Sequence, residues 1–185
     1  AMLDAIAQRL AKMVDPLHGG IGGAPKFPQP SIFELLWRAA RRTRDPALAG
    51  LVTLTLERMA QGGIYDHLGG GFARYSTDAT WLAPHFEKML YDNAQLIELM
   101  TLVWQETKAP LLAARVAETI AWLTREMIAE MGAFAATLDA DSEGEEGKFY
   151  VWSATEIGRL LGEEEARIFK DAYDVSAHGN WEGHV

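Results

Sequence analysis

Glycine-rich stretches follow three of the helices that the hydrophobic pattern predicts, and this alternation constrains the fold most. Residues 19–21 and 62–64 both read Gly-Gly-Ile, and residues 132–134 read Gly-Ala-Phe. A single pair of helices cannot bury its apolar stripe alone, so neighbouring pairs must stack against one another. We therefore expect a mainly α-helical array of helical hairpins joined by glycine-rich loops.

Helical periodicity, first-turn prolines and capping patterns together predict five long helices over residues 3–14, 31–42, 45–61, 84–107 and 110–131. The second is predicted to open with a capping box formed by Ser31 and Glu34. The third has Asp45 at its cap position, followed by Pro46 at the first helical position. These features predict where the helices begin.

Residues 133–152 differ in character from the rest of the chain. Two strand-like runs, 133–138 and 148–152, flank an acidic turn, 139–147, which predicts one short β-hairpin. Ser153 and Glu156 form a second capping box, and two short helices are expected beyond it, separated near Gly162. No low-complexity linker interrupts the chain, so we expect one domain over residues 2–185.

Composition restricts the classes of partner. The chain has 17 Lys and Arg against 26 Asp and Glu, a net charge of −9. This balance argues against a nucleic acid partner and against an anionic membrane surface. Neither a membrane-spanning run nor a signal peptide is evident, and the absence of cysteine excludes a disulfide framework or a thiolate zinc site within this chain. We expect a cytoplasmic protein without a membrane partner, metal or cofactor.

The densest group of chemically capable side chains lies in the glycine-rich segment 62–75. It contains Tyr65, Asp66, His67 and Arg74 among glycines that let the backbone approach a ligand. Loops at one end of a helical array are common places for binding sites. We predict that this segment forms part of a site. The alternative is that the glycines only make the turn while Asp66 and Arg74 form a structural pair.

A second group follows in the predicted helix that begins at residue 84. On that helix His85, Lys88 and Asp92 would lie along one stripe, with Glu87 and Tyr91 on the next. The helix dipole would disfavour an imidazolium near the N-terminus, leaving His85 neutral and able to accept a proton. The alternative is a core histidine beside an ion pair between Lys88 and Asp92.

The acidic segment 139–147 opens like a calcium-binding loop. Its first, third and fifth positions are acidic and its sixth is glycine, but Tyr150 occupies the twelfth position, where a bidentate glutamate is needed. A solvated acidic turn is one alternative. In another, Asp139 or Asp141 points into the same cavity as His85.

Four motifs in order, at 22–28, 62–75, 81–96 and 139–152, resemble the bacterial YyaL-type family, whose animal relatives are the spermatogenesis-associated thioredoxin-domain proteins. The resemblance covers essentially the whole chain. It implies an incomplete (α/α)6 toroid of the six-hairpin glycosidase superfamily, with about three of the six hairpins. Family members resemble a thioredoxin-like domain followed by such a toroid. We therefore expect a piece of a longer protein, with Ala1 as the remnant of a tag.

The resemblance also implies a carbohydrate-active protein, similar to sugar 2-epimerases or to unsaturated glucuronyl hydrolases. In the epimerase version the catalytic candidates are His85 and His67 as acid and base, assisted by Asp66 and Asp92. Ten further residues are predicted to bind the substrate: Tyr65, Arg74, Tyr75, Trp81, Glu87, Lys88, Tyr91, Asn93, Asp139 and Asp141.

Two alternatives to the epimerase version remain. In the hydrolase version two carboxylates flank the scissile bond, chosen from Asp66, Glu87, Asp92 and Asp141. A non-catalytic module would instead hold a glycan or a peptide and serve the thioredoxin-like domain. Because half a toroid leaves apolar seams exposed, we also expect self-association or marginal stability.

Overall fold

The computed structural model describes residues 2–180. The expected tag remnant Ala1 and the end of the expected domain, residues 181–185, lie outside the described residues. The chain forms two compact units, one up to Ala140 and one from Asp141 onward. The first unit contains most of the helices and all of the long-range sheet pairing.

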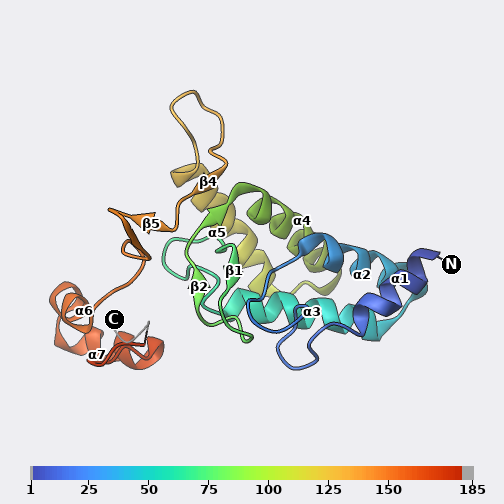
Figure 1. The fold of residues 1–185 in the computed structure, drawn as a ribbon, viewed down its shortest axis with the longest axis horizontal. Coiled ribbons are helices and arrows are strands. Elements are labelled where there is room, and N and C mark those ends of the chain that lie inside the picture. Colours follow the sequence, from blue (N-terminus) through green and yellow to red (C-terminus); the bar gives the residue numbers. More distant parts are fainter. Residues whose placement is uncertain (1, 181–185) are drawn as a thin grey trace. The chain divides into compact units, whose positions relative to one another are not determined.

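Five helices make up most of the first unit: α1 (Met2–Ala11), α2 (Pro30–Thr43), α3 (Pro46–Gln61), α4 (Leu90–Thr107) and α5 (Pro110–Glu126). Consecutive helices pack as pairs, α2 with α3 and α4 with α5. Helices two apart also pack, α2 with α4 and α3 with α5, which defines two helical layers (Figure 1). The expected array of helical hairpins is therefore confirmed in this unit.

Two helix starts show where local patterns succeed and fail. Asp45 caps α3 as predicted, because its side chain accepts hydrogen bonds from two backbone N–H groups of the first turn. The predicted capping box at Ser31 is wrong: α2 already begins at Pro30, and Glu34 instead bonds to Arg38 one turn later. The fifth helix also ends earlier than predicted, at residue 126.

The predicted helix start at Pro84 is wrong. Residues 84–89 form two short strands, β2 (Pro84–His85) and β3 (Lys88–Met89), and α4 begins only at Leu90. β2 pairs with β1 (Tyr75–Ser76), and β3 pairs with β4 (Thr137–Leu138). The backbone of this segment thus bonds to segments up to 50 residues away (Lys88 pairs with Leu138), which the local sequence pattern does not reveal.

The second unit contains a smaller hairpin than expected. Its strands are β5 (Asp141–Ser142) and β6 (Glu145–Glu146), so the hairpin lies inside the acidic segment. The long hairpin predicted between 133–138 and 148–152 is wrong, because the first of these runs pairs with β3 instead. Helices α6 (Ala154–Leu161) and α7 (Glu163–Tyr173) follow as predicted, and the capping box of Ser153 and Glu156 is present.

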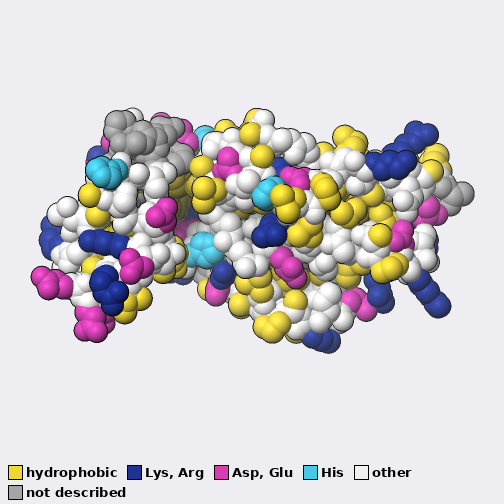
Figure 2. Space-filling model, turned by 90° about the horizontal axis from the view of Figure 1, so that it is seen from below, with side chains coloured by type: hydrophobic (Ala, Val, Ile, Leu, Met, Phe, Trp, Pro, Cys, Tyr) yellow, Lys and Arg dark blue, Asp and Glu magenta, His cyan; other side chains and the backbone are white. Residues whose placement is uncertain are grey.

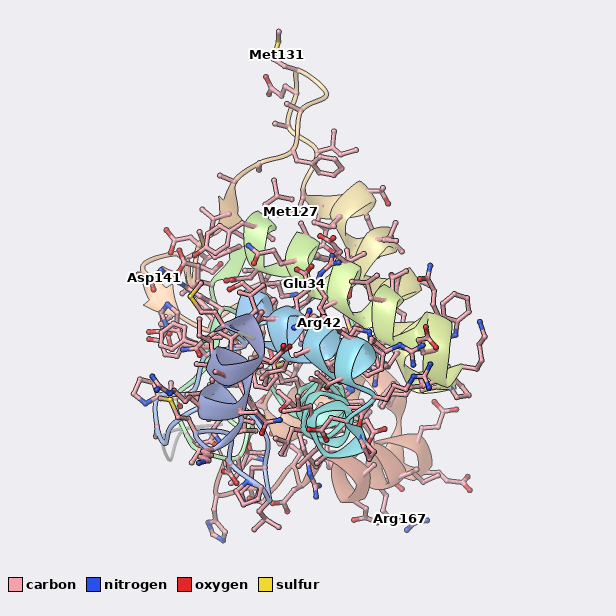
Figure 3. The ribbon with its side chains drawn as sticks, turned by 90° about the vertical axis from the view of Figure 1, so that its right-hand side faces the viewer. Glu34, Arg42, Met127, Met131, Asp141 and Arg167 are labelled. Carbon is pink, nitrogen blue, oxygen red and sulfur yellow. The ribbon has the colours of Figure 1, made fainter. Side chains whose placement is uncertain are left out.

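The core of the first unit is formed by large apolar side chains from several helices, among them Phe33, Leu36, Leu56, Leu96 and Leu99. On the surface, hydrophobic side chains are interspersed with charged ones over the face that Figure 2 shows. Met131 is 94% exposed at the tip of the loop that leaves Met127 (Figure 3). Within residues 2–180, no helix has the length and apolar character needed to cross a membrane.

Candidate functional site

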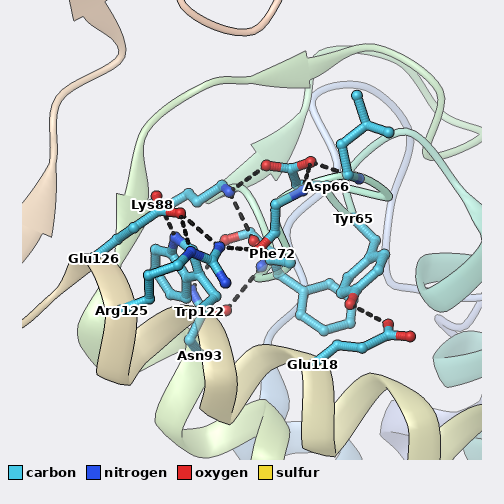
Figure 4. Close-up of polar contacts among 12 residues, drawn as sticks. Tyr65, Asp66, Phe72, Lys88, Asn93, Glu118, Trp122, Arg125 and Glu126 are labelled. Atoms are coloured by element: carbon cyan, nitrogen blue, oxygen red, sulfur yellow. Dashed lines mark hydrogen bonds and ion pairs between the residues drawn. The ribbon is translucent and has the colours of Figure 1, made fainter.

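Asp66 organises the glycine-rich turn that follows α3. Its Oδ1 accepts hydrogen bonds from the backbone N–H groups of Leu68 (3.0 Å) and Gly69 (2.8 Å). Its Oδ2 accepts a hydrogen bond of 2.8 Å from Lys88 Nζ, which also donates to the carbonyl of Gly70 at 2.8 Å (Figure 4). The ion pair thereby ties the turn to β3.

The Asp66–Lys88 pair is a structural tie whose charges are satisfied. Burial alone would raise the pKa of Asp66, but the Lys88 charge and the hydrogen bonds to this carboxylate hold that pKa below its usual value. Burial lowers the pKa of Lys88, while the charge of Asp66 opposes that shift. The ammonium also lies 4.9 Å from the centre of the Trp122 ring. The ion pairs considered from sequence, Lys88 with Asp92 and Asp66 with Arg74, are therefore wrong.

Asn93 clamps the same turn from the first part of α4. Its Oδ1 accepts a hydrogen bond from the Phe72 N–H at 2.8 Å. Its Nδ2 donates to the carbonyls of Phe72 and Met89 at 3.0 and 2.9 Å. The side chain is fully buried, and both its oxygen and its nitrogen bond to the backbone. The polar groups of Asn93 are therefore used by the protein backbone and are not presented to a substrate.

Two aromatic side chains predicted to bind the substrate make structural contacts within the protein instead. The Tyr65 hydroxyl donates to Glu118 Oε2 at 2.5 Å, and burial together with this carboxylate raises the pKa of Tyr65. Trp81 is completely buried, and its Nε1 donates to the carbonyl of His18 at 2.8 Å. A ring with no exposed surface cannot stack on a sugar in this structure.

His67 contacts protein groups through both ring nitrogens. Nε2 lies 2.9 Å from the carbonyl oxygen of Gly62, and Nδ1 lies 3.3 Å from an Arg115 guanidinium nitrogen. Because a carbonyl only accepts and a guanidinium only donates, Nε2 carries the proton and Nδ1 accepts. Both ring nitrogens of His67 are thus engaged by protein groups in this structure.

The remaining candidates of this region gather around Glu87, which lies between β2 and β3. Arg74 Nη1 donates to Glu87 Oε2 at 2.8 Å, and the backbone N–H of Arg74 donates to the Glu87 carbonyl at 2.8 Å. His85 Nε2 lies 3.9 Å from the same carboxylate oxygen. Thr137 of β4 reaches the other oxygen at 3.5 Å. We call Arg74, Tyr75, His85, Glu87 and Asp92 the Glu87 cluster.

Asp92 differs from the other carboxylates because its charge is poorly compensated. Burial raises its pKa to about 6; the charge of Arg74 opposes this shift and the charge of Glu87 adds to it. A carboxyl with such a pKa can donate a proton near neutral pH. Tyr91, the preceding residue, is exposed in the first turn of α4, and with Glu87 it raises the pKa of Arg74.

Two aromatic rings of the Glu87 cluster form a row with a third ring, that of Phe27. Tyr75 and His85 are directly paired across β1 and β2, and their rings stack at 4.7 Å with an angle of 12°. Phe27 lies 4.6 Å from the Tyr75 ring at 33°. Phe27 belongs to the motif at 22–28, and its place beside a glycine-rich loop already makes it one of the aromatic residues that could stack on a sugar ring.

The two acidic candidates beyond β4 are placed differently. Asp139 is exposed directly after β4, and Asp141 belongs to the second unit, in β5 paired with Glu146. Among residues 2–180 no group of three or more histidine and acidic side chains is arranged to hold a metal ion.

Solved structures place the arrangement in a fold class. Cellobiose 2-epimerase from Bacillus thermoamylovorans superimposes with a TM-score of 0.61 at 14% identity, covering 92% of this chain and 53% of that one. An unsaturated glucuronyl hydrolase specific for heparin gives 0.62 at 10% identity, covering 93% and 52%. The fold is a partial (α/α)6 toroid, about half of such a chain.

Sequence relatives identify the family, although no family model matches the chain. Spermatogenesis-associated protein 20 from Mus musculus is 42% identical over 166 residues, which are 84% of this chain and 21% of that protein. The Homo sapiens protein is 40% identical over the same length. The chain belongs to this YyaL-like family and spans about a fifth of the length of these curated relatives.

Proposed function

We propose that the Glu87 cluster is the sugar site of a carbohydrate-active enzyme of the epimerase or isomerase type. The observation that carries this proposal is the meeting of two proton-transfer groups around one ion pair. An imidazole, His85, and a carboxyl with a pKa of about 6, Asp92, both neighbour the Arg74–Glu87 pair. The shared fold with sugar epimerases supports the same class of chemistry by analogy.

In this proposal one group removes a proton from the carbon beside the sugar carbonyl and the other returns a proton to the opposite face. Arg74 stabilises the negative charge that develops on the carbonyl oxygen. We assign the pair as His85 and Asp92 rather than His85 and His67. The reason is that both nitrogens of His67 already bond to protein groups.

The test uses the full-length protein that contains this segment, incubated in D₂O with a panel of free sugars, amino sugars and reducing disaccharides. Loss of the C2 proton is followed by NMR. We expect exchange in the wild type, its loss in His85→Ala and Asp92→Asn, and its retention in the matched control His67→Ala. A folded protein that exchanges no sugar proton would refute the epimerase assignment.

A second candidate is glycoside hydrolysis, favoured by the two neighbouring carboxyl groups of different character. Glu87 is ion-paired with Arg74, whereas the raised pKa of Asp92 suits a general acid. Release of aryl alcohol from a panel of aryl glycosides, abolished by Glu87→Gln and by Asp92→Asn, would identify this reaction. Sugar binding without either reaction would identify a non-catalytic glycan-binding module.

A further inference from the structure

We propose that Phe27 is the stacking platform for a second sugar ring, so that the Glu87 cluster acts on a disaccharide or a longer glycan rather than on a free monosaccharide. This inference rests on the proposed function, because it needs a first sugar ring at the Glu87 cluster. It adds Phe27 to the proposed binding site and specifies the length of the substrate, which the Glu87 cluster alone does not define.

The first observation is that the backbone beside Phe27 is anchored by hydrogen bonds while the Phe27 side chain stays outside the core. Phe27 is 38% exposed, although Lys26 before it and Pro28 after it are buried. Lys26 is fixed by hydrogen bonds of 2.9 Å to Asp15 and to the Gly19 carbonyl. An exposed aromatic ring on an anchored backbone loses little conformational freedom when it binds a ligand.

The backbone places Phe27 beside the cluster. Lys26 and Ser76 exchange two main-chain hydrogen bonds of 2.8 and 2.9 Å, which joins the 26–28 segment to β1. Because β1 in turn pairs with β2, the rings of Phe27, Tyr75 and His85 follow one another across three neighbouring segments. Phe27 is therefore one ring further from Glu87 than Tyr75.

The stacking of the three rings indicates which of them has a surface that a ligand can contact. Tyr75 is in ring contact with Phe27 on one side and with His85 on the other, at 4.6 and 4.7 Å. Phe27 has only this one ring contact among the described residues and keeps more than a third of its surface exposed. An aromatic face of this kind suits the apolar C–H face of a pyranose ring.

The chemistry of Phe27 also sets what kind of selectivity to expect. Its ring offers apolar area and no hydrogen-bonding group, whereas Arg74 and Glu87 offer charged hydrogen-bonding groups. Selectivity for the arrangement of hydroxyl groups on the first sugar would therefore come from hydrogen bonds with the Glu87 cluster. Phe27 would bind a second pyranose ring by shape alone, so we expect little selectivity for the identity of the second sugar.

The experiment measures equilibrium binding by calorimetry with the full-length protein. The probes are cellobiose beside glucose, and N,N′-diacetylchitobiose beside N-acetylglucosamine. Stacking worth about 0.5–1.5 kcal/mol corresponds to a change of about 2- to 10-fold in affinity. We expect Phe27→Ala to weaken the better disaccharide by that factor and to leave its monosaccharide unchanged, while Phe27→Trp retains binding.

Phe134→Ala is the matched control, since Phe134 is 49% exposed in the same unit but lies in the loop after α5. It should change neither affinity. Equal loss of monosaccharide and disaccharide binding in Phe27→Ala would overturn the second subsite, as would equal wild-type affinities for both. Binding of neither sugar pair would overturn the sugar site itself. Disaccharide binding that depends on Phe27 without any proton exchange would support the subsite and refute the epimerase reaction.

Discussion

Two turns of the first unit, one after α1 and one after α3, hold a buried lysine in the same way. We name them the first anchor (Asp15, Lys26 and Trp81) and the second anchor (Asp66, Lys88 and Trp122). In each, the aspartate Oδ1 accepts two backbone N–H groups, two and three residues further on. The aspartate Oδ2 and the carbonyl four residues beyond the aspartate accept the lysine ammonium.

The resemblance extends to the packing of glycine against tryptophan. Gly20 and Gly71 stand at equivalent positions, five residues beyond each aspartate, with φ of +72° and +85°. A Cβ at Gly20 would approach the Trp81 ring to 2.5 Å, and a Cβ at Gly71 would approach the Trp122 ring to 2.6 Å. Both the backbone conformation and the space therefore require glycine.

The anchors differ in what lies between the turn and the lysine. Lys26 follows Ile21, the last bridged residue of the first turn, by 5 positions, whereas Lys88 follows Phe72 by 16. The longer segment of the second anchor includes most of the Glu87 cluster: Arg74, Tyr75, His85 and Glu87. The candidate site is therefore carried by a longer segment whose two ends are fixed by the turn and by the buried lysine of the second anchor.

The largest expected effects come from removing the tryptophans. Trp81→Ala and Trp122→Ala should each lower the free energy of unfolding by about 3–5 kcal/mol, because both side chains are completely buried. Trp81 lies in the large core cluster and Trp122 in a small one, so the first loss should be greater. Urea denaturation followed by circular dichroism measures both.

The control for this pair is Trp152→Ala, since Trp152 is 42% exposed in the second unit. It should change stability by less than about 1 kcal/mol. A larger loss for Trp122→Ala than for Trp81→Ala would break the ranking of the two anchors. It would mean that the second anchor, with the candidate site attached, is the more stabilising one.

The next effect concerns the lysines. Lys26→Met and Lys88→Met keep the volume but leave an aspartate without its ion-pair partner, at a cost of about 3 kcal/mol each. Asp66→Asn with Lys88→Met should recover part of this loss, because asparagine can still accept the two backbone N–H bonds. Urea denaturation checks the series, with exposed Lys12→Met as a control. Equal losses for the single and double variants would show that the charge is not the cause.

The repeat was visible in the sequence but in the wrong alignment. The matching letters Gly-Gly-Ile at 19–21 and 62–64 suggest one equivalence, whereas the structure equates residues 14–21 with 65–72. Short identical strings mislead here because equivalence depends on the aspartate that begins each turn. The helical array, the start of α3 and the pair α6–α7 could be predicted from local patterns alone.

The site could be predicted only in part, for a similar reason. Pro84 indicated a helix, and His85 and Lys88 were expected on one face of it. In the structure His85 belongs to β2 and Lys88 to β3, which are strands of two different sheets, and Lys88 is buried whereas His85 is half-buried. Strand pairing with Tyr75 and with Leu138 decides these positions, and no local pattern encodes such distant partners.

A smaller and pH-dependent effect distinguishes the site from the anchors. The folded state raises the pKa of Asp92 from about 3.8 to about 6, so it favours the protonated form. The associated stability is present below pH 4 and is lost as the pH rises through 6. Asp92→Asn should therefore raise the stability at pH 8 by about 2 kcal/mol and change it little at pH 3.5. The expected gain is less than the ~3 kcal/mol that the full pKa shift corresponds to, because Asp92 is partly exposed and solvent screens its charge.

Asp66 should behave in the opposite way, because its pKa is lowered in the folded state. Its contribution is present above pH 4 and is lost as the pH falls through its folded-state pKa. Thermal melts at several pH values distinguish the two carboxyls, with exposed Glu98→Gln as the control. A gain for Asp92→Asn that is the same at every pH would indicate a packing effect instead of a charge effect.

The smallest effect is expected where the repeated frame lacks its anchor. Ile128 and Phe134 bridge a third turn, but Ala129 stands where the two anchors have an aspartate. Two backbone hydrogen bonds close this turn, from the N–H of Ala129 to the carbonyl of Ala133 and from the N–H of Gly132 to the carbonyl of Ala129, both 2.8 Å. Met131→Ser at its exposed tip should therefore change the unfolding free energy by less than about 0.5 kcal/mol.

Met127→Ser is the matched comparison, because Met127 is completely buried at the base of the same loop (Figure 3). It should cost about 2–5 kcal/mol by loss of apolar burial. Urea denaturation measures both variants, and light scattering of the wild type and Met131→Ser reports association. A loss above 1 kcal/mol for Met131→Ser, together with a smaller particle, would show that the unanchored tip packs against another molecule in solution.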